Sequence, residues 1–244
     1  MRMPSFDHPI FTESIARIRA ELGRRTAGDP ALARWLQRLN PLERDVLERC
    51  IHSSGDVTIA TDLVFSPAGA DVLPAPAAET AAVAGACSQA LAALRAGAPI
   101  LTDTAMAAAA VTPMARRSLG VTVHGLLDWA PPQAPCGSTR SAAAVESAWT
   151  ALTASGPAPL VLIGSAPTAL ERLLDLVAAG APAPALVVGM PVGFVGVAES
   201  KRRLAASGLA QIRLEGSRGG AALAAAAINA LLRRAWLDQA ACPV

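Results

Sequence analysis

The sequence predicts an α/β protein with a mostly parallel sheet, helices on both faces of the sheet, and an N-terminal helical layer. Two observations support this fold class. Between residues 96 and 236, short apolar runs that end in Gly, Asp or Pro alternate with longer helical patterns, which is typical of βαβ units. Residues 1–60 are rich in charged side chains and contain helical patterns only. The 244 residues are enough for one domain with a sizeable core.

Each element is expected from its own local pattern. Apolar runs predict strands at residues 100–102, 121–123, 160–163, 185–188 and 212–214. Helical spacing predicts helices at residues 12–22, 41–53, 84–96, 139–154, 167–179, 198–206 and 221–236. Residues 66–76, rich in Pro and Ala, are expected to form a loop. No strong linker divides the chain, so we expect a single domain over residues 1–244, with the helical layer at 1–60 and the α/β core at 96–236.

Composition argues against several classes of function. The net charge is +2 and the arginines are scattered, which does not favour nucleic-acid binding. Aromatic residues are few, with no Tyr, four Trp and four Phe, so platforms for stacking bases are not expected. The longest apolar run, residues 221–232, is shorter than the roughly 20 residues of a membrane span. Residues 1–7 lack the apolar segment of a signal peptide, so we expect a cytoplasmic protein that does not bind membranes.

Cysteine and histidine spacing predicts no metal site. The four cysteines lie far apart without a C-x-x-C pair, and the three histidines lack the spacing of metal ligands. Nucleotide cofactors are not supported either, because neither a Walker A loop nor a G-x-G-x-x-G turn after a strand is present. We therefore expect a protein that uses no metal and no cofactor.

The most distinctive segment runs from Gly189 to Lys201. It follows a predicted buried strand, turns through Pro191 and spaced glycines, and then opens a helix. Such a turn lets the backbone approach a ligand closely and leaves helix N–H groups free to face an anion. Lys201 is the only lysine of the chain. A tight connection without a ligand remains the alternative interpretation.

The predicted helix at residues 41–53 carries a second candidate site. At 100° per residue, Arg49 and His52 are neighbours on its polar face, since they are three residues apart. A cation beside a titratable imidazole suits an anionic substrate that requires a proton transfer. The alternative is a solvated histidine stabilised by the dipole at the C-terminal end of the helix.

Polar groups also follow several predicted strands. Asp103 comes directly after one of them and is either an acid/base group or a carboxylate that caps a helix. Gly164-Ser165 and Gly216 to Gly220 are glycine turns before helices, and Thr139-Arg140 opens another helix. Because parallel strands direct their carboxyl ends to one edge, these groups are expected to gather there.

Together, these segments resemble the precorrin-8X methylmutase (precorrin isomerase) family of cobalamin biosynthesis. The resemblance runs from His8-Pro9-Ile10 to Asn229-Ala230-Leu231, and its most specific block is Gly189 to Lys201. Supporting blocks in family order begin at Cys50, Asp62, Ala96, Thr139, Ala166 and Arg218.

The resemblance implies an isomerase that moves a methyl group from C11 to C12 of precorrin-8X, or of its cobalt form, to give hydrogenobyrinic or cobyrinic acid without an external cofactor. It makes His52 the catalytic proton donor and acceptor, and Ser14 and Arg49 substrate-binding residues. It also implies a homodimer. We expect Met190 and Phe194 to form an apolar wall for the tetrapyrrole. The full set of other substrate-binding residues that we expect is Asp103, Thr139, Arg140, Gly164, Met190, Gly193, Phe194 and Gly219.

The sequence departs from the family pattern at several positions. Serine replaces asparagine at Ser138 and Ser165, and Thr112-Pro113 stands where the family has Thr-Arg. Loss of amides and of a cation could weaken binding or change the form of the substrate. A divergent paralogue that binds a corrinoid without turnover therefore remains an alternative to the active isomerase. A third interpretation, an unrelated doubly wound enzyme that uses Asp103, requires the motif matches to be accidental.

Overall fold

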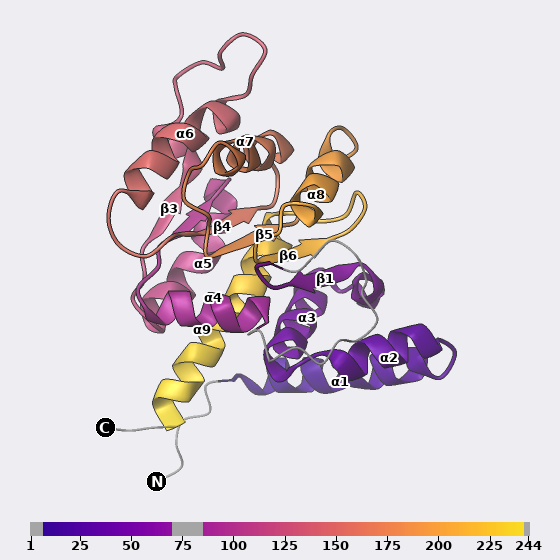
Figure 1. Ribbon diagram of the computed structural model, residues 1–244. Coiled ribbons are helices and arrows are strands. Elements are labelled where there is room, and N and C mark those ends of the chain that lie inside the picture. The colour runs from indigo at the N-terminus through magenta and orange to yellow at the C-terminus, as the bar shows by residue number, and fades with distance from the viewer. Residues whose placement is uncertain (1–6, 70–84, 242–244) are drawn as a thin grey trace.

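The computed structural model describes residues 7–69 and 85–241, which form a six-stranded sheet enclosed by helices (Figure 1). The strand order is β1-β6-β5-β4-β2-β3. All neighbouring strands are parallel except β1 and β6, which are antiparallel. The strands are β1 (Leu63–Ser66), β2 (Ile100–Thr102), β3 (Val123–Gly125), β4 (Leu160–Ile163), β5 (Leu186–Gly189) and β6 (Gln211–Leu214).

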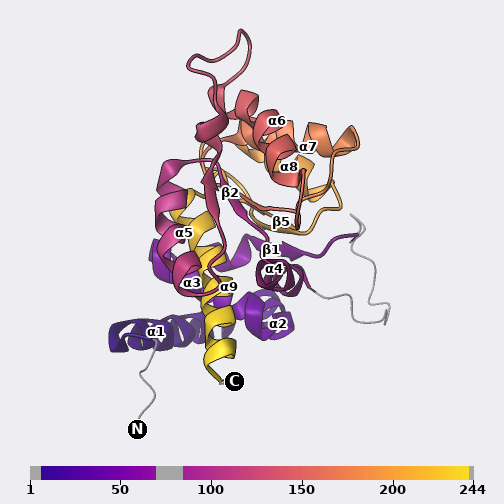
Figure 2. The same cartoon turned by 90° about the vertical axis from the view of Figure 1, so that its left-hand side faces the viewer.

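Helices cover both faces of the sheet, and further helices form an outer layer (Figures 1 and 2). One face carries α6 (Arg140–Thr153), α7 (Pro167–Ala178) and α8 (Val197–Ala205). The other face carries α4 (Ala86–Arg95), α5 (Ala105–Arg117) and α9 (Ala221–Ala241). Helix α3 (Pro41–Ser54) packs on α9, and α1 (Pro9–Thr26) and α2 (Pro30–Arg38) lie outside it. Two short 3₁₀ helices are η1 (Val57–Thr61) and η2 (Leu126–Trp129). The predicted fold class is confirmed.

Strand β4 shows how the core is divided between the two faces. Leu160 and Leu162 belong to the apolar cluster beneath α9, whereas Val161 and Ile163 belong to the cluster beneath α6 and α7. All four are buried, because successive side chains of a strand point to opposite faces and both faces are covered. This explains why the strand has a continuous apolar sequence.

Two helices and one strand were not expected from the sequence. Helix α2 begins at the Asp29-Pro30 pair, where the Asp29 carboxylate accepts hydrogen bonds from two backbone N–H groups. Helix α5 contains Pro113, which lacks an N–H group and normally ends a helix. Strand β1 is a short edge strand of four residues, and it pairs with β6 across a long sequence separation.

The remaining differences are at element boundaries. Strand β3 begins at Val123, two residues later than the predicted start. Its pairing with β2 starts next to the hydrogen bond that the Thr122 carbonyl accepts from the Ile100 N–H at 2.9 Å. The predicted loop at 66–76 loses Ser66 to β1, and its residues 70–76 lie outside the described residues, as does Ala84 of the predicted helix 84–96. The single-domain organisation stays a prediction.

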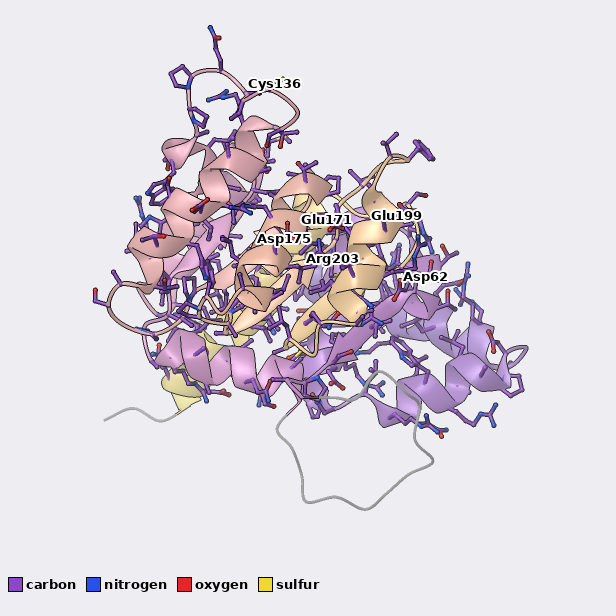
Figure 3. The ribbon with its side chains drawn as sticks, turned by 45° about the horizontal axis from the view of Figure 1, so that its top comes forward. Asp62, Cys136, Glu171, Asp175, Glu199 and Arg203 are labelled. Carbon is purple, nitrogen blue, oxygen red and sulfur yellow. The ribbon has the colours of Figure 1, made fainter. Side chains whose placement is uncertain are left out.

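Surface features complete the description. Arg203 of α8 forms ion pairs with Glu171 and Asp175 of α7, and Figure 3 shows the three side chains together on that face. Cys136 lies in the projecting loop before α6 (Figure 3). Within the described part of the chain, no helix is both long and apolar enough to span a membrane.

Candidate active site

The end of α3 holds the histidine singled out in the sequence. The helix begins with a capping box, in which Asn40 and Glu43 each bind the backbone of the other, and Pro41 occupies its first turn. It ends at Gly55, whose φ of 68° is left-handed and favours glycine. These signals place His52 in the last turn, where the side chain is exposed.

His52 is held by α1. Its Nδ1 lies 2.7 Å from Ser14 Oγ, and the Phe11 ring meets the imidazole edge-on with 5.1 Å between centroids. Desolvation and, to a smaller extent, the charge of Arg49 lower the pKa of His52. With Nδ1 bound to Ser14, Nε2 is the nitrogen left for a proton exchange with a ligand.

Arg49 is a half-buried cation beside this histidine. Its guanidinium lies 4.9 Å from the centroid of the Phe11 ring, a cation–π contact. None of the described acidic residues forms an ion pair with it, and Asp7, whose charge raises the pKa of Arg49, is bound to Arg233 at 2.8 Å. Burial lowers the pKa of Arg49, and the neighbouring charge of Arg233 lowers it further. Phe11, Ser14, Arg49 and His52, which we call the His52 cluster, thus present a cation that an anion could neutralise.

A cavity of about 530 Å³ lies between α1, α3 and α9 and shares Phe11 with the His52 cluster. Its walls include Asp7, Asp45, Glu48 and Arg233. Arg19 lines it as well and pairs with Glu48, as Arg233 pairs with Asp7, so two of the three acidic groups are neutralised by cations of the same wall.

Asp103 organises the carboxyl edge of the sheet. Its Oδ2 accepts hydrogen bonds from the N–H groups of Gly164, Ser165 and Ala166 at 3.0, 2.6 and 2.8 Å. The side chain is only 1% exposed, and this burial raises the pKa of Asp103 against the effect of the hydrogen bonds. Asp103 thus caps the loop that leads into α7, and direct contact with a substrate does not fit its burial.

The turns at the same edge require glycine because side chains would not fit. A Cβ on Gly164 would lie 2.6 Å from the Ala221 Cα, and one on Gly219 would lie 2.0 Å from the Met190 carbonyl oxygen. Gly193 has a φ of 139°, in the region that side chains avoid. Gly164, Gly193 and Gly219, with the loops around them, form what we call the sheet-edge loops.

Three other predicted residues lie at exposed positions of this edge. Thr139 caps α6 and its Oγ1 lies 2.8 Å from Thr168 Oγ1. Arg140 donates from Nε to the Pro131 carbonyl at 2.9 Å. Phe194 is 96% exposed and stands free of the protein surface.

Met190 does not lie where the sequence led us to expect. Its side chain is 0% exposed and belongs to the core beneath α9, so it cannot form an apolar wall for a ligand. The residue after the end of a buried strand is still within the core here. The apolar side chains that are exposed at this edge are Val192, Phe194 and Val195 after β5, Met106 at the start of α5 and Leu127 after β3.

The first turn of α9 connects the two regions. Cys50 of α3 donates from Sγ to the Leu223 carbonyl at 3.8 Å, and Ala221 packs against Gly164. The loop before α9 reaches the other way, since Arg218 binds Asp56 just beyond the end of α3. The structure therefore brings the His52 cluster and the sheet-edge loops to neighbouring places in the fold.

Several contributors were not expected from the sequence. Phe11 lies one residue before the helix expected at 12–22 and Arg233 lies in the helix expected at 221–236, but no pattern marked either as a site residue. Arg218 was expected only as part of the glycine turn at 216–220 and as the start of a family block. A search of the described residues finds no group of three or more His, Cys, Asp or Glu that could hold a metal ion.

Comparison with known proteins identifies the family. The family model described as precorrin-8X methylmutase matches residues 9–234. The chain belongs to this family. The precorrin-8X methylmutase of Pseudomonas aeruginosa is 42% identical over 91% of this chain and 93% of its own length. The cobalt-precorrin-8 methylmutase of Synechocystis is 33% identical over 97% of this chain and 100% of its own.

A solved structure supports the same family assignment as these two relatives. The crystal structure of a precorrin-8X methylmutase from Thermus thermophilus superposes with a TM-score of 0.73 and 35% identity, and the match covers 93% of this chain and 98% of that one. The predicted family is thus confirmed in sequence and in fold, and the resemblance extends beyond the Gly189 to Lys201 block to nearly the whole chain.

Proposed function

We propose that this protein is a methylmutase that moves a methyl group from C11 to C12 of precorrin-8X or of cobalt-precorrin-8. The product is hydrogenobyrinic acid or cobyrinic acid. The observation that carries the proposal is the His52–Ser14 pair beside Arg49, a cation that forms no ion pair with the described acidic residues, in a chain of the methylmutase family. A cytoplasmic location suits a biosynthetic enzyme of this kind and is part of the proposal.

His52 moves the proton. In the imidazolium form, Nδ1–H donates to Ser14 Oγ and Nε2–H is directed to a nitrogen of the macrocycle. Protonation withdraws electrons from the conjugated ring and makes it a better acceptor for the migrating methyl group. The same proton returns to His52 after the shift, so substrate and product differ only in the position of the methyl group.

Arg49 couples binding to this chemistry. The substrate carries acetate and propionate carboxylates, which a guanidinium binds well. Because the charge of Arg49 contributes to the low pKa of His52, a carboxylate that neutralises Arg49 raises that pKa again. The bound substrate thereby favours the protonated, catalytically active imidazole.

The sheet-edge loops bind the rest of the macrocycle. Thr139 and Arg140, at exposed positions of this edge, meet further carboxylates, and Phe194 offers an apolar face to the ring. A homodimer completes the site. Phe194 and Val195 are strongly exposed, and covering these apolar side chains with a second subunit is favourable. Sedimentation of the purified protein measures this association, and a monomer at working concentration would contradict it.

The test of the proposed function is spectroscopic. Precorrin-8X and its cobalt form are each mixed with the protein, and the absorption spectrum is followed. Conversion by the wild type and by Ser53→Ala, but not by His52→Ala, supports the proposal; Ser53 is the exposed neighbour of His52. A tight complex with a shifted spectrum and no conversion would favour the non-catalytic corrinoid-binding alternative.

A further inference from the structure

Lys201 is a buried cation that the proposed chemistry does not use. Its side chain is 0% exposed, and Nζ donates to the carbonyl oxygens of Gly216 and Arg218 at 2.8 and 2.7 Å. Glu199, the acidic neighbour on α8, pairs with Arg202 instead. Burial lowers the pKa of Lys201 to about 8, although the charges of Glu215 and Asp62 oppose this. A charge kept in the core at such a cost calls for a function.

The two carbonyls belong to the loop that leads from β6 into α9, residues 216–220. The same loop supports the turn after β5. The Ser217 carbonyl accepts from the Gly193 N–H at 3.1 Å, and the Gly220 N–H donates to the Met190 carbonyl at 2.8 Å. Gly219 lies so close to Met190 that no side chain fits between them. The position of Gly193, and of Phe194 after it, therefore depends on the conformation of loop 216–220.

Loop 216–220 also holds the segment after α3. Arg218 Nη1 lies 2.9 Å from Asp56 Oδ2 and 2.6 Å from Thr58 Oγ1, and Nη2 pairs with Asp62. Asp56 directly follows Gly55, the residue that ends α3. With its carbonyl fixed by Lys201, Arg218 can hold the end of the helix that carries His52.

We propose that Lys201 is a positioning residue that fixes loop 216–220 and thereby sets the Gly193–Phe194 turn relative to the His52 helix. The geometry supports this because one ammonium group binds the two carbonyls on either side of Ser217, the residue that bonds to Gly193. Because its side chain is 0% exposed, Lys201 acts through the loop and not by contact with a ligand. The inference rests on the proposed function, since it concerns how the two halves of that site are aligned.

The test compares Lys201→Met with Arg202→Met, which changes the exposed neighbour on the same helix. Methionine keeps the length and apolar stem of Lys201 but cannot bind the two carbonyls. We expect KM to rise about tenfold with a lower kcat, as for a misaligned site, and the dissociation constant of hydrogenobyrinic acid to rise by a similar factor. A smaller folded fraction would lower the apparent kcat alone, because KM and the dissociation constant do not depend on how much protein is active.

A second variant keeps the inference testable if Lys201→Met does not fold. Arg218→Gln breaks the bonds to Asp56 and Asp62 at a partly exposed position, and we expect it to weaken product binding in the same way. In the double variant the two effects should not multiply, since both act through one loop. Wild-type KM and product binding in Arg218→Gln, or fully multiplicative effects, would overturn the inference. Product binding is measured without turnover, so a wild type that fails to convert precorrin-8X refutes only the proposed function.

Discussion

The His52 cluster and the sheet-edge loops are built by opposite means. In the cluster, side chains from α1 and α3 meet at an exposed surface, where burial and, to a smaller extent, the charge of Arg49 lower the pKa of His52. At the sheet edge, the loops are held by hydrogen bonds of their backbone groups, and the charged residues Asp103 and Lys201, which accept or donate several of these bonds, are buried. Substitutions in the cluster should therefore change chemistry and leave the fold intact, whereas substitutions at the edge should change the fold first.

The largest effect should come from His52→Ala. Loss of the proton donor and acceptor is expected to lower kcat by about 10²–10⁴-fold, while the melting temperature stays close to that of the wild type because the side chain is exposed. Turnover and thermal unfolding measure the two quantities, with Ser53→Ala as the control. A large loss of stability in His52→Ala would break the contrast between the two regions.

Gly219→Ala should have the next largest effect, which is a loss of stability. The added Cβ would lie 2.0 Å from a backbone oxygen, at a φ of 159°, so the backbone must move. We expect a loss of about 3 kcal/mol or more in the free energy of unfolding. Gly23→Ala within α1 is the control, since a Cβ added at Gly23 would meet nothing within 4 Å, and it should gain roughly 0.5–1 kcal/mol. Equal stabilities in denaturant would show that the edge is not rigid.

Asp103→Ala should destabilise the protein by less. Three N–H groups in the loop before α7 lose their acceptor, so we expect a loss of about 1–3 kcal/mol. Denaturant unfolding measures the change, with Asp128→Ala as a control at the surface. Because the folded-state pKa of Asp103 is raised, its ionisation costs stability; this cost is absent below the unfolded pKa and grows as the pH rises toward the folded pKa. The wild type should show this pH dependence and the variant should lack it.

The smallest effect is a shift in the titration of His52. Arg49→Gln removes a neighbouring positive charge and should raise the pKa of His52, which nuclear magnetic resonance of the imidazole Cε1–H can follow. Arg38→Gln, on the exposed surface of α2, should leave the titration unchanged. An unchanged His52 pKa in Arg49→Gln would mean that burial alone lowers it, and that a substrate carboxylate does not adjust the acid as proposed.

The sequence predicted the helices and buried strands well wherever the signal was local. The apolar run at 160–163 could only be a buried strand, and α3 has both a capping box and a terminal glycine. Helix α5 was missed because Pro113 usually breaks helices, and β1 because four residues at a sheet edge depend on β6 for their structure. Each miss arises where a partner distant in the sequence compensates for a weak local signal.

For the site, the same distinction holds. Arg49 and His52 share a helix, so their spacing alone made them neighbours. Ser14 was expected at the site only by resemblance, since it is 38 residues from His52. Met190 was misplaced because a strand pattern does not show where burial ends.

By itself, the sequence determined the fold class and the family and made Arg49 and His52 neighbours, because periodicity, helix caps and motif order are local properties. Only the tertiary structure decided what the buried charges do. Asp103 became the cap of a loop and Lys201 the anchor of another, since their partners are backbone groups whose positions follow from packing. A backbone N–H or carbonyl is the same at every residue, so no sequence pattern distinguishes the one that a buried charge will bind.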